Sequence, residues 1–347
     1  MSLLKVKEVT PGMVLNKDVE NTKTGAILLA SGTVLNRNNL TTLKNLGVEY
    51  VDIYESQSIK DNYLIIDDDK FIDTYNAFAD KTKNILSNAR FGKKIVVNEI
   101  GEIANEMIDE IVKSNNILGR LRLIEEDNDY TFQHSLDVSM LAVMIGKWLG
   151  YSSIELKQIS LAGLFHDIGK VKISNDIMYK PCKLTESEFE LVKKHTIFGY
   201  SILDETIGIS KNIAYAALQH HEREDGSGYP LGVKSEKIHE YAKIVAVCDI
   251  FDAMTTKRIY KDKQSPFLVA EHIISSSFGV LDPRIATIFT NNISKFYVGN
   301  IIKLNTGEIG EIIYVHKQVP TRPIVKVEDK FIDLLNEKDK YILDVIN

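Results

Sequence analysis

The sequence lacks several features that would place it in a specialised class of proteins. Its 347 residues include only two cysteines, Cys182 and Cys248, and neither belongs to a CxxC pair. This pattern excludes a disulfide framework and a thiolate zinc site, so we expect a reducing, cytoplasmic setting. No run approaches the roughly 18 apolar residues of a membrane span, and no apolar signal core precedes the first charges. We therefore expect neither a membrane-spanning segment nor secretion.

A basic excess is also absent. Lys and Arg total 42 against 48 Asp and Glu, which gives a net charge of -6. This balance argues against a broad face for a nucleic-acid polymer but leaves room for a small phosphorylated ligand. Hydrophobic residues make up 44% and charged residues 26%, values typical of a globular protein. At about 150 residues per domain, the length predicts two or three domains.

The residue pattern divides the chain into four segments. Residues 1–55 combine short β-type runs, turns and a helix at 37–46, which predicts a small α+β module. Residues 56–128 form a connecting segment with helical spacing, interpreted as core-facing helices rather than a coiled coil. Residues 129–292 are almost wholly helical in pattern, and residues 293–347 return to β-type runs that predict a small β-barrel-like module. We expect a mainly α protein.

Five of the eight histidines fall between positions 134 and 221. Each lies on or at the end of a predicted helix, on the side that faces the common interior. These residues are His134, His166, His195, His220 and His221. A lone histidine of this kind is usually a satisfied core residue, but the joint placement favours metal binding. The other three, His239, His272 and His316, have no such neighbours and are interpreted as surface or core residues.

Two carboxylates accompany these imidazoles. Asp167 follows His166 directly, and Asp249 lies inside an apolar run, where an ionised carboxylate needs a partner or a cation. Five imidazoles and two carboxylates can hold two metal ions if one carboxylate bridges them. Nitrogen and oxygen donors without thiolate suit iron, manganese or zinc better than calcium or magnesium.

Two predicted helices in this region begin with capping boxes. Ser152 with Glu155 begins one helix, and Thr185 with Glu188 begins another. We expect the first helix to bring His166 to its inner end. We expect the second to carry His195 one turn after its last apolar residues.

The motifs around these residues resemble those of the HD-GYP family, a branch of the HD superfamily of metal-dependent phosphohydrolases. The resemblance covers about residues 129–290. Its motifs are Tyr130-Thr131-x-x-His134, His166-Asp167-Ile168-Gly169-Lys170, Lys194-His195, His220-His221-Glu222, Asp225-Gly226-Ser227-Gly228-Tyr229-Pro230 and Asp249-x-x-Asp252-Ala253. Arg258, Tyr260 and Lys261 follow at the spacing usual in the family.

The resemblance implies a helical catalytic domain that hydrolyses cyclic di-GMP to pGpG and leaves further hydrolysis to GMP open. It implies two divalent metal ions with a hydroxide between them as the nucleophile. The first would be held by His134, His166, Asp167 and Asp249, and the second by Asp167, His195, His220 and His221. Iron or manganese is favoured, with zinc or nickel open. Some family members carry an acidic residue where this chain has Tyr130 and hold a third metal, so we expect two.

The resemblance also implies roles for residues outside the ligand set. Asp167 and Lys170 would be catalytic, and Lys170, Tyr229, Arg258 and Lys261 would bind substrate. The GYP loop comprises Asp225, Gly226, Gly228, Tyr229 and Pro230, and its glycines permit close approach of the backbone. Tyr229 would pack against a base or hold the loop closed. Glu222, Asp225 and Asp252 are candidates to orient the histidines or the loop.

Other interpretations stay open from the sequence. An HD phosphohydrolase for a different nucleotide would share the metal ligands without needing the GYP loop. A binding protein could sense a cyclic dinucleotide through the same site with little turnover. The flanking modules could carry the function, although packing or oligomerisation is the expected role for both. The resemblance also allows a homodimer and protein contacts through the GYP loop.

Overall fold

The computed structural model describes most of the chain. The described residues are 2–10, 13, 15–17, 19–20, 27–29, 35, 37–53, 68–93, 95, 97–113, 130–178, 180, 182–256 and 263–346. The chain divides into two compact units, residues 67–263 with 269–292, and residues 1–66 with 264–268 and 293–347. The division into four domains stays a prediction. None of the helices in the described ranges is long and apolar enough to cross a bilayer.

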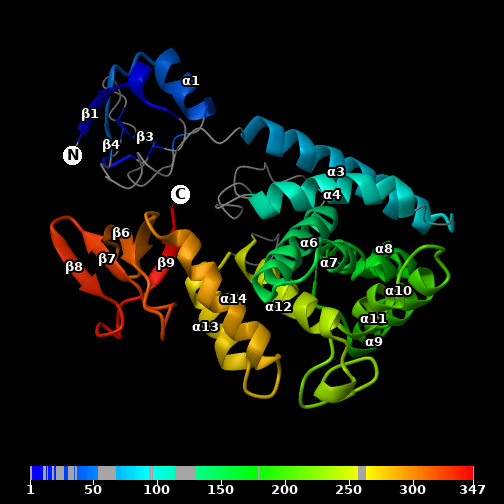
Figure 1. Cartoon of the computed structure of the whole chain (residues 1–347). Helices are drawn as coiled ribbons and strands as arrows, with labels where there is room; N and C mark the ends of the chain where they lie inside the picture. The colour runs from blue at the N-terminus through cyan, green and yellow to red at the C-terminus, as the bar shows by residue number, and fades with distance from the viewer. Residues whose placement is uncertain are drawn as a thin grey trace. The chain divides into compact units, whose positions relative to one another are not determined.

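Helices make up nearly all of the segment expected to be helical (Figure 1). They are α3 (Asp68–Arg90), α4 (Val97–Lys113), α6 (Tyr130–Leu149), α7 (Ser153–Phe165), α8 (Asn175–Met178), α9 (Glu186–Lys193), α10 (His195–Asp204), α11 (Lys211–Gln219), α12 (Glu240–Thr255), α13 (Pro266–Ser276) and α14 (Pro283–Ile293). The short 3-10 helices η2 (Ile168–Lys172) and η3 (Ser235–Lys237) lie in the connections. The expectation of a mainly α protein is confirmed.

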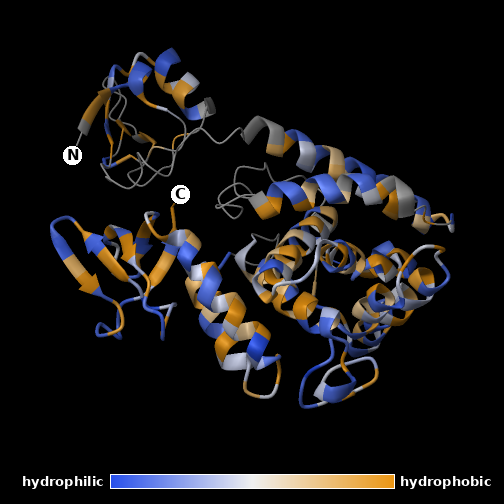
Figure 2. Ribbon diagram, viewed as in Figure 1, coloured by the Kyte–Doolittle hydropathy of each residue, from blue (hydrophilic) through white to orange (hydrophobic). Residues whose placement is uncertain are grey.

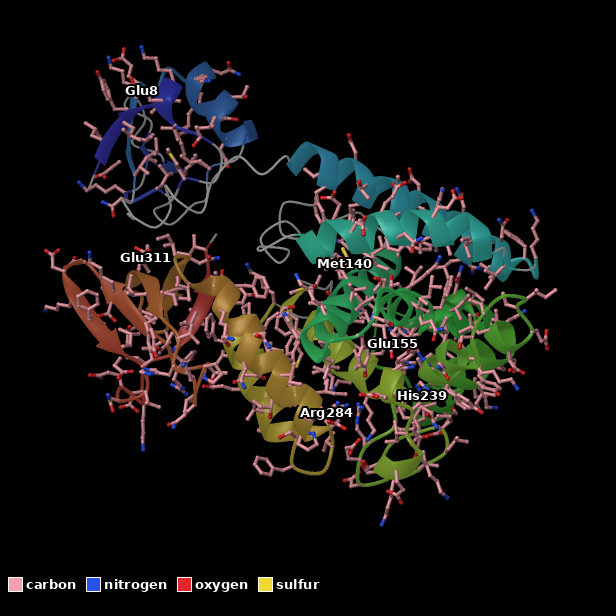
Figure 3. The ribbon with its side chains drawn as sticks, viewed as in Figure 1. Glu8, Met140, Glu155, His239, Arg284 and Glu311 are labelled. Carbon is pink, nitrogen blue, oxygen red and sulfur yellow. The ribbon has the colours of Figure 1, made fainter. Side chains whose placement is uncertain are left out.

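Four helices enclose the core in which the histidines lie. Helix α6 packs against α7 and α12, and α11 packs against α7 and α12 (Figure 1). Apolar residues colour these four helices strongly in Figure 2. Every residue of α6 from 134 to 146 is buried, including Met140, which Figure 3 labels. A helix buried on all sides places its polar residues in the interior as well, so a histidine on α6 must find partners inside the protein.

The two predicted capping boxes are present. The Ser152 hydroxyl accepts a hydrogen bond from the Glu155 N–H at 3.4 Å, and the Glu155 carboxylate accepts one from the Ser152 N–H at 2.8 Å. The pair of Thr185 and Glu188 does the same at 3.3 and 2.7 Å. The second helix differs from the expectation, because α9 ends at Lys193 and His195 begins α10. The Lys194 N–H bonds to the carbonyls of the preceding turn, and this tight turn redirects the chain.

The amino-terminal module is a small α+β arrangement, as expected. Strand β1 (Ser2–Lys5) pairs antiparallel with β4 (Tyr50–Ile53), and β2 (Val19–Glu20) pairs antiparallel with β3 (Ile27–Leu29). Helix α1 (Arg37–Asn45) ends just before Gly47, whose φ of 72° is the left-handed conformation common after helices. Apolar residues of these elements form a core of their own.

The carboxyl-terminal module is an open sheet. Its strands are β5 (Ile301–Leu304), β6 (Ile309–Tyr314), β7 (Ile324–Val327), β8 (Lys330–Asp333) and β9 (Ile342–Val345). They pair antiparallel in the order β8-β7-β6-β5-β9. Within residues 293–346, all of which the structure describes, the edge strands β8 and β9 do not pair. A barrel requires that closure, so the predicted β-barrel-like module is not found.

Candidate metal centre

The five predicted histidines meet in one place. They come from four different parts of the helical unit: His134 lies on α6, His166 ends α7, His195 begins α10, and His220 and His221 follow α11. Centroids of neighbouring rings lie 4.1 to 5.4 Å apart. All but His221 are buried, and His221 is half-buried. The predicted convergence of these imidazoles is therefore observed.

Asp167 belongs to two sets of possible ligands at once. The first set consists of His134, His166 and Asp167, and the second consists of Asp167, His195, His220 and His221. In each set one ligand atom from every member lies within 4.8 Å of all the others. The spacing suits two cation sites that share one carboxylate, and both sets lack thiolates.

Asp249 lies near the first set but outside it. Its Oδ1 atom is 3.2 Å from His134 Nε2. Burial opposes its ionisation, but hydrogen bonding and the charge of His134 hold the pKa of Asp249 well below its usual value. An ionised carboxylate this close to a ligand atom is available to a cation. Its assignment as a ligand stays a prediction, because neither ligand set includes Asp249.

Two buried atoms of the site lack a hydrogen bond within the described structure. His166 Nε2 makes none, although Asp167 Oδ2 lies 3.3 Å away. Asp167 Oδ1 makes none, although His195 Nε2 lies 3.2 Å away. Buried polar atoms without partners are costly, and atoms that approach closely without bonding fit donors directed at a common cation. The residues present therefore fit a divalent metal ion.

The outward ring nitrogens of four histidines are fixed by hydrogen bonds. The Nδ1 atoms of His166, His195 and His220 lie 2.6, 2.7 and 3.0 Å from the carbonyl oxygens three residues earlier. His134 Nδ1 lies 2.6 Å from Asp252 Oδ2. Such contacts select the ring orientation and leave Nε2 for the interior, which is the usual arrangement of metal-binding histidines.

Burial and neighbouring charges shift the pKa values of the carboxylate and imidazole donors in different directions. Burial opposes the charge of His134, but hydrogen bonds to Asp249 and Asp252 outweigh it and raise the pKa of His134 to about 10. Burial also opposes ionisation of Asp167, but the charges of Lys170 and His166 hold its pKa well below the usual value. Burial lowers the pKa of His220 strongly and that of His221 to about 3. These two imidazoles are therefore neutral and can donate lone pairs.

A second layer of acids lies behind His134. Asp252 is buried on α12, and Asp137 is buried on α6. Burial and the negative charge of Asp252 raise the pKa of Asp137 well above its usual value. Asp252 was predicted from the sequence to be an orienting partner. Asp137 was not, because its position on the helix does not indicate that it lies near Asp252.

Lys170 contacts the shared carboxylate. It lies on η2, one turn beyond His166, and its Nζ donates a hydrogen bond to Asp167 Oδ2. Its side chain is 27% exposed, so the ammonium group also meets solvent. Arg258 and Lys261, the other predicted phosphate-binding cations, lie outside the described residues. The side chain of Tyr130, where a third metal was excluded, also lies outside the described part.

The GYP loop is fastened to the end of α11. Glu222 is buried, and its carboxylate accepts hydrogen bonds from the N–H groups of Leu231 at 2.7 Å and Val233 at 3.2 Å. Asp225 accepts a bond from the Ser227 N–H at 2.9 Å, which shapes a turn. Gly226 has a φ of 84°, a conformation that favours glycine. Glu222 and Asp225 therefore shape the loop rather than the metal ligands.

Sequence reasoning missed three polar residues that hold this region. Gln219 donates to the Lys237 carbonyl at 3.0 Å and accepts from the His239 N–H at 2.8 Å. Lys243 binds the carboxylates of Glu224 at 3.1 Å and Asp282 at 3.3 Å. Lys193 lies over the Tyr229 ring. Of these three residues, only Gln219 could have been noticed in the sequence, because it directly precedes the pair His220-His221.

The remaining histidines lie outside the cluster. His239, labelled in Figure 3, caps α12 by accepting a hydrogen bond from the Tyr241 N–H at 3.1 Å. His316 pairs with Asp333 in the carboxyl-terminal sheet at 2.9 Å. His239 and His316, interpreted from the sequence as surface or core residues, thus serve in a helix cap and in a side-chain pair of the sheet.

Comparisons with known proteins support the interpretation of the helical unit. A family model described as HD domain matches residues 119–283. A cyclic di-GMP phosphodiesterase of Pseudomonas aeruginosa is 32% identical over 246 residues, which cover 70% of this chain and 59% of that protein. The 3'3'-cGAMP-specific phosphodiesterase 1 of Vibrio cholerae is 32% identical over 217 residues, which cover 62% of this chain and 47% of that protein. The chain thus spans about half to three fifths of the length of these curated relatives.

A solved structure shows the same fold. The structure of an HDG"Y"P protein from Bdellovibrio bacteriovorus covers 84% of this chain and 99% of that one, with a TM-score of 0.53 at 15% sequence identity. The similarity extends beyond the segment matched by the family model. Residues 119–283 thus match the HD domain family, and the motifs within this segment resemble those of the HD-GYP branch.

Proposed function

We propose that the protein is a metal-dependent phosphodiesterase that hydrolyses cyclic di-GMP. The observation that carries the proposal is Asp167, whose carboxylate belongs to both sets of ligand atoms. Two cations held there would supply Lewis acidity and an activated water at neutral pH. Iron or manganese is favoured for these sites, with zinc or nickel open.

In the proposed reaction, water adds to one phosphorus of the cyclic dinucleotide. A new P–O bond forms, the bond from phosphorus to the 3' oxygen breaks, and that oxygen leaves with a proton, which gives linear pGpG. Hydrolysis of pGpG to GMP would repeat this step. Asp167, His166 and the other members of the two ligand sets would hold the metals, and Asp249 would complete the first set.

Lys170 would bind the phosphate during this reaction. Its ammonium contacts the Asp167 carboxylate while the side chain stays partly exposed, so it can also donate to a phosphate oxygen from the solvent side. Arg258 and Lys261 are included in the proposal on the strength of their spacing in the sequence. An expected count of two metals, rather than three, follows from Tyr130.

The other predicted properties belong to the same proposal. The two cysteines are free, one exposed and one buried, which supports a reducing, cytoplasmic location. Leu231, next to the GYP loop, is 55% exposed and supports protein contacts there. The predicted homodimer stays a proposal.

A second candidate substrate is 3'3'-cGAMP. The observation that favours it is the relative from Vibrio cholerae, which is named for that substrate and is as similar in identity as the relative named for cyclic di-GMP. The two substrates differ in one base and share the phosphodiester chemistry, so the metal centre itself does not separate them.

The proposal is tested by hydrolysis of defined nucleotides. Protein loaded with manganese or iron is incubated with cyclic di-GMP, 3'3'-cGAMP or pGpG, and the products are separated by chromatography. We expect pGpG from cyclic di-GMP, with no product from chelated protein or from Asp167→Asn. Turnover of 3'3'-cGAMP without turnover of cyclic di-GMP would identify 3'3'-cGAMP as the substrate. Tight binding without turnover in fully loaded protein would support a sensor and overturn the proposal.

A further inference from the structure

His221 is held differently from the other four histidines. His134, His166, His195 and His220 each have Nδ1 within 3.0 Å of a carboxylate or carbonyl oxygen. In the described part of the chain, His221 has no hydrogen bond at either ring nitrogen. Metal-binding histidines nearly always have their second nitrogen fixed in this way. The orientation of His221 therefore depends on something else.

A ring contact with Tyr229 takes that place. The Tyr229 ring lies 4.6 Å from the His221 ring, measured between centroids, with an angle of 30° between the planes. The Tyr229 N–H also donates to the His221 carbonyl at 3.2 Å. The ammonium of Lys193 lies over the Tyr229 ring at 5.5 Å from its centroid. Tyr229 is thus occupied by protein groups, and its main ring contact is a predicted metal ligand.

The loop is built to keep Tyr229 there. A Cβ on Gly228 would lie 2.5 Å from backbone atoms of His221, Glu222 and Arg223, so only glycine allows this approach. Glu222, buried one residue after His221, accepts two backbone hydrogen bonds from the far side of the loop. Tyr229 is therefore positioned against His221 by the residues directly beside His221.

We propose that Tyr229 is a positioning residue that orients His221 for metal binding through its ring, rather than a residue that binds substrate through its hydroxyl. This inference rests on the proposed metal centre. The contact with the Tyr229 ring restricts the rotation of the His221 imidazole, as a hydrogen bond at Nδ1 does for the other four histidines. Loss of the ring weakens the cation site formed by Asp167, His195, His220 and His221.

The test compares Tyr229→Phe, which keeps the ring, with Tyr229→Leu, which removes it. Metal content is measured by elemental analysis, and metal affinity by competition with a chelator. We expect Tyr229→Phe to bind metal like the wild type, and Tyr229→Leu to bind the metal of the site that contains His221 about 10-fold less tightly. Tyr200→Leu is the matched control, because its ring pairs with Tyr215 rather than with a predicted ligand.

Different failures have different meanings. Unchanged metal affinity in Tyr229→Leu refutes this inference alone, and so does a raised KM with full metal content in Tyr229→Phe. Wild type that fails to bind a second metal refutes the proposed metal centre and the inference with it. Glu222→Gln, which weakens the loop attachment while keeping Tyr229, gives an independent measurement if Tyr229→Leu does not fold. We expect Glu222→Gln to weaken metal binding as well. Unchanged metal affinity in this variant would also count against the inference.

Discussion

His134 Nδ1 and Asp252 Oδ2 lie 2.6 Å apart inside the helical unit, between α6 and α12. Both side chains are almost fully buried. The contact turns the other nitrogen of His134 toward Asp249 and Asp167. One helix therefore supplies a predicted metal ligand, and the other supplies the acid that orients it.

Asp252→Asn tests this relationship. The substitution keeps the shape of the side chain but removes the charge that fixes His134, so we expect metal affinity to fall by about 10-fold to 100-fold. Chelator competition measures the change. Thr256→Val is the matched control, because it removes only the hydrogen bond that Thr256 donates to Asp252 Oδ1 at 3.1 Å. Equal metal affinity in wild type and Asp252→Asn would contradict the orienting role.

Lys170→Met tests the assignment of a phosphate-binding cation. Removal of the ammonium takes away a positive charge expected at the phosphate, so kcat/KM for cyclic di-GMP should fall by about 100-fold. Metal content should stay at the wild-type level, since Lys170 belongs to neither ligand set. Lys172→Met, which removes a neighbouring exposed cation on η2, is the control. A similar loss in both variants would show that only the general charge matters.

Gly169→Ala tests the packing of η2 against α10. A Cβ on Gly169 would lie 1.9 Å from the His195 carbonyl oxygen and 2.5 Å from the Gly199 nitrogen. Backbone atoms cannot give way cheaply, so we expect the free energy of unfolding to fall by about 3 kcal/mol. Urea unfolding of metal-free protein measures it. Gly101→Ala is the control, since its Cβ would meet only the flexible end of Lys157, at 3.2 Å.

The stability of α9 should depend on pH through Glu188. Hydrogen bonds from Lys180 and from the Thr185 N–H lower its pKa from 4.5 to about 2. The ionised Glu188 carboxylate therefore stabilises the folded state above about pH 4.5. This stabilisation is lost as the pH falls toward 2 and the carboxylate becomes protonated. We expect Glu188→Gln to lower the Tm at pH 7, with a difference from wild type that shrinks below pH 4.5. Glu186→Gln, a charge removal in the same first turn, should show a smaller difference at pH 7.

Local features of the site were predictable from the sequence. The capping boxes at Ser152 and Thr185 depend on contacts three residues apart, so the helix starts follow from the sequence alone. The convergence of the histidines follows from helical periodicity, because each imidazole shares a face with buried apolar residues. The turn at Lys194 was missed, since the apolar pattern continues across it while the helix does not.

Contacts between distant parts of the chain were less predictable. The attachment of the loop by Gln219, the ion pairs of Lys243 and the acid pair of Asp137 and Asp252 depend on distances that periodicity does not contain. The carboxyl-terminal strands gave a pattern typical of barrels, but the pattern does not specify whether the edge strands meet. The β-type runs expected in this segment were 298–304, 308–315 and 324–327, so β8 and β9, the two strands that form the open edges, were not predicted.

The membership of Asp167 in both ligand sets has a consequence for how the protein takes up metal. A cation held by one ligand set would share the Asp167 carboxylate with a cation held by the other. The two binding events are therefore linked, and a titration with metal should depart from the curve of two independent, equal sites.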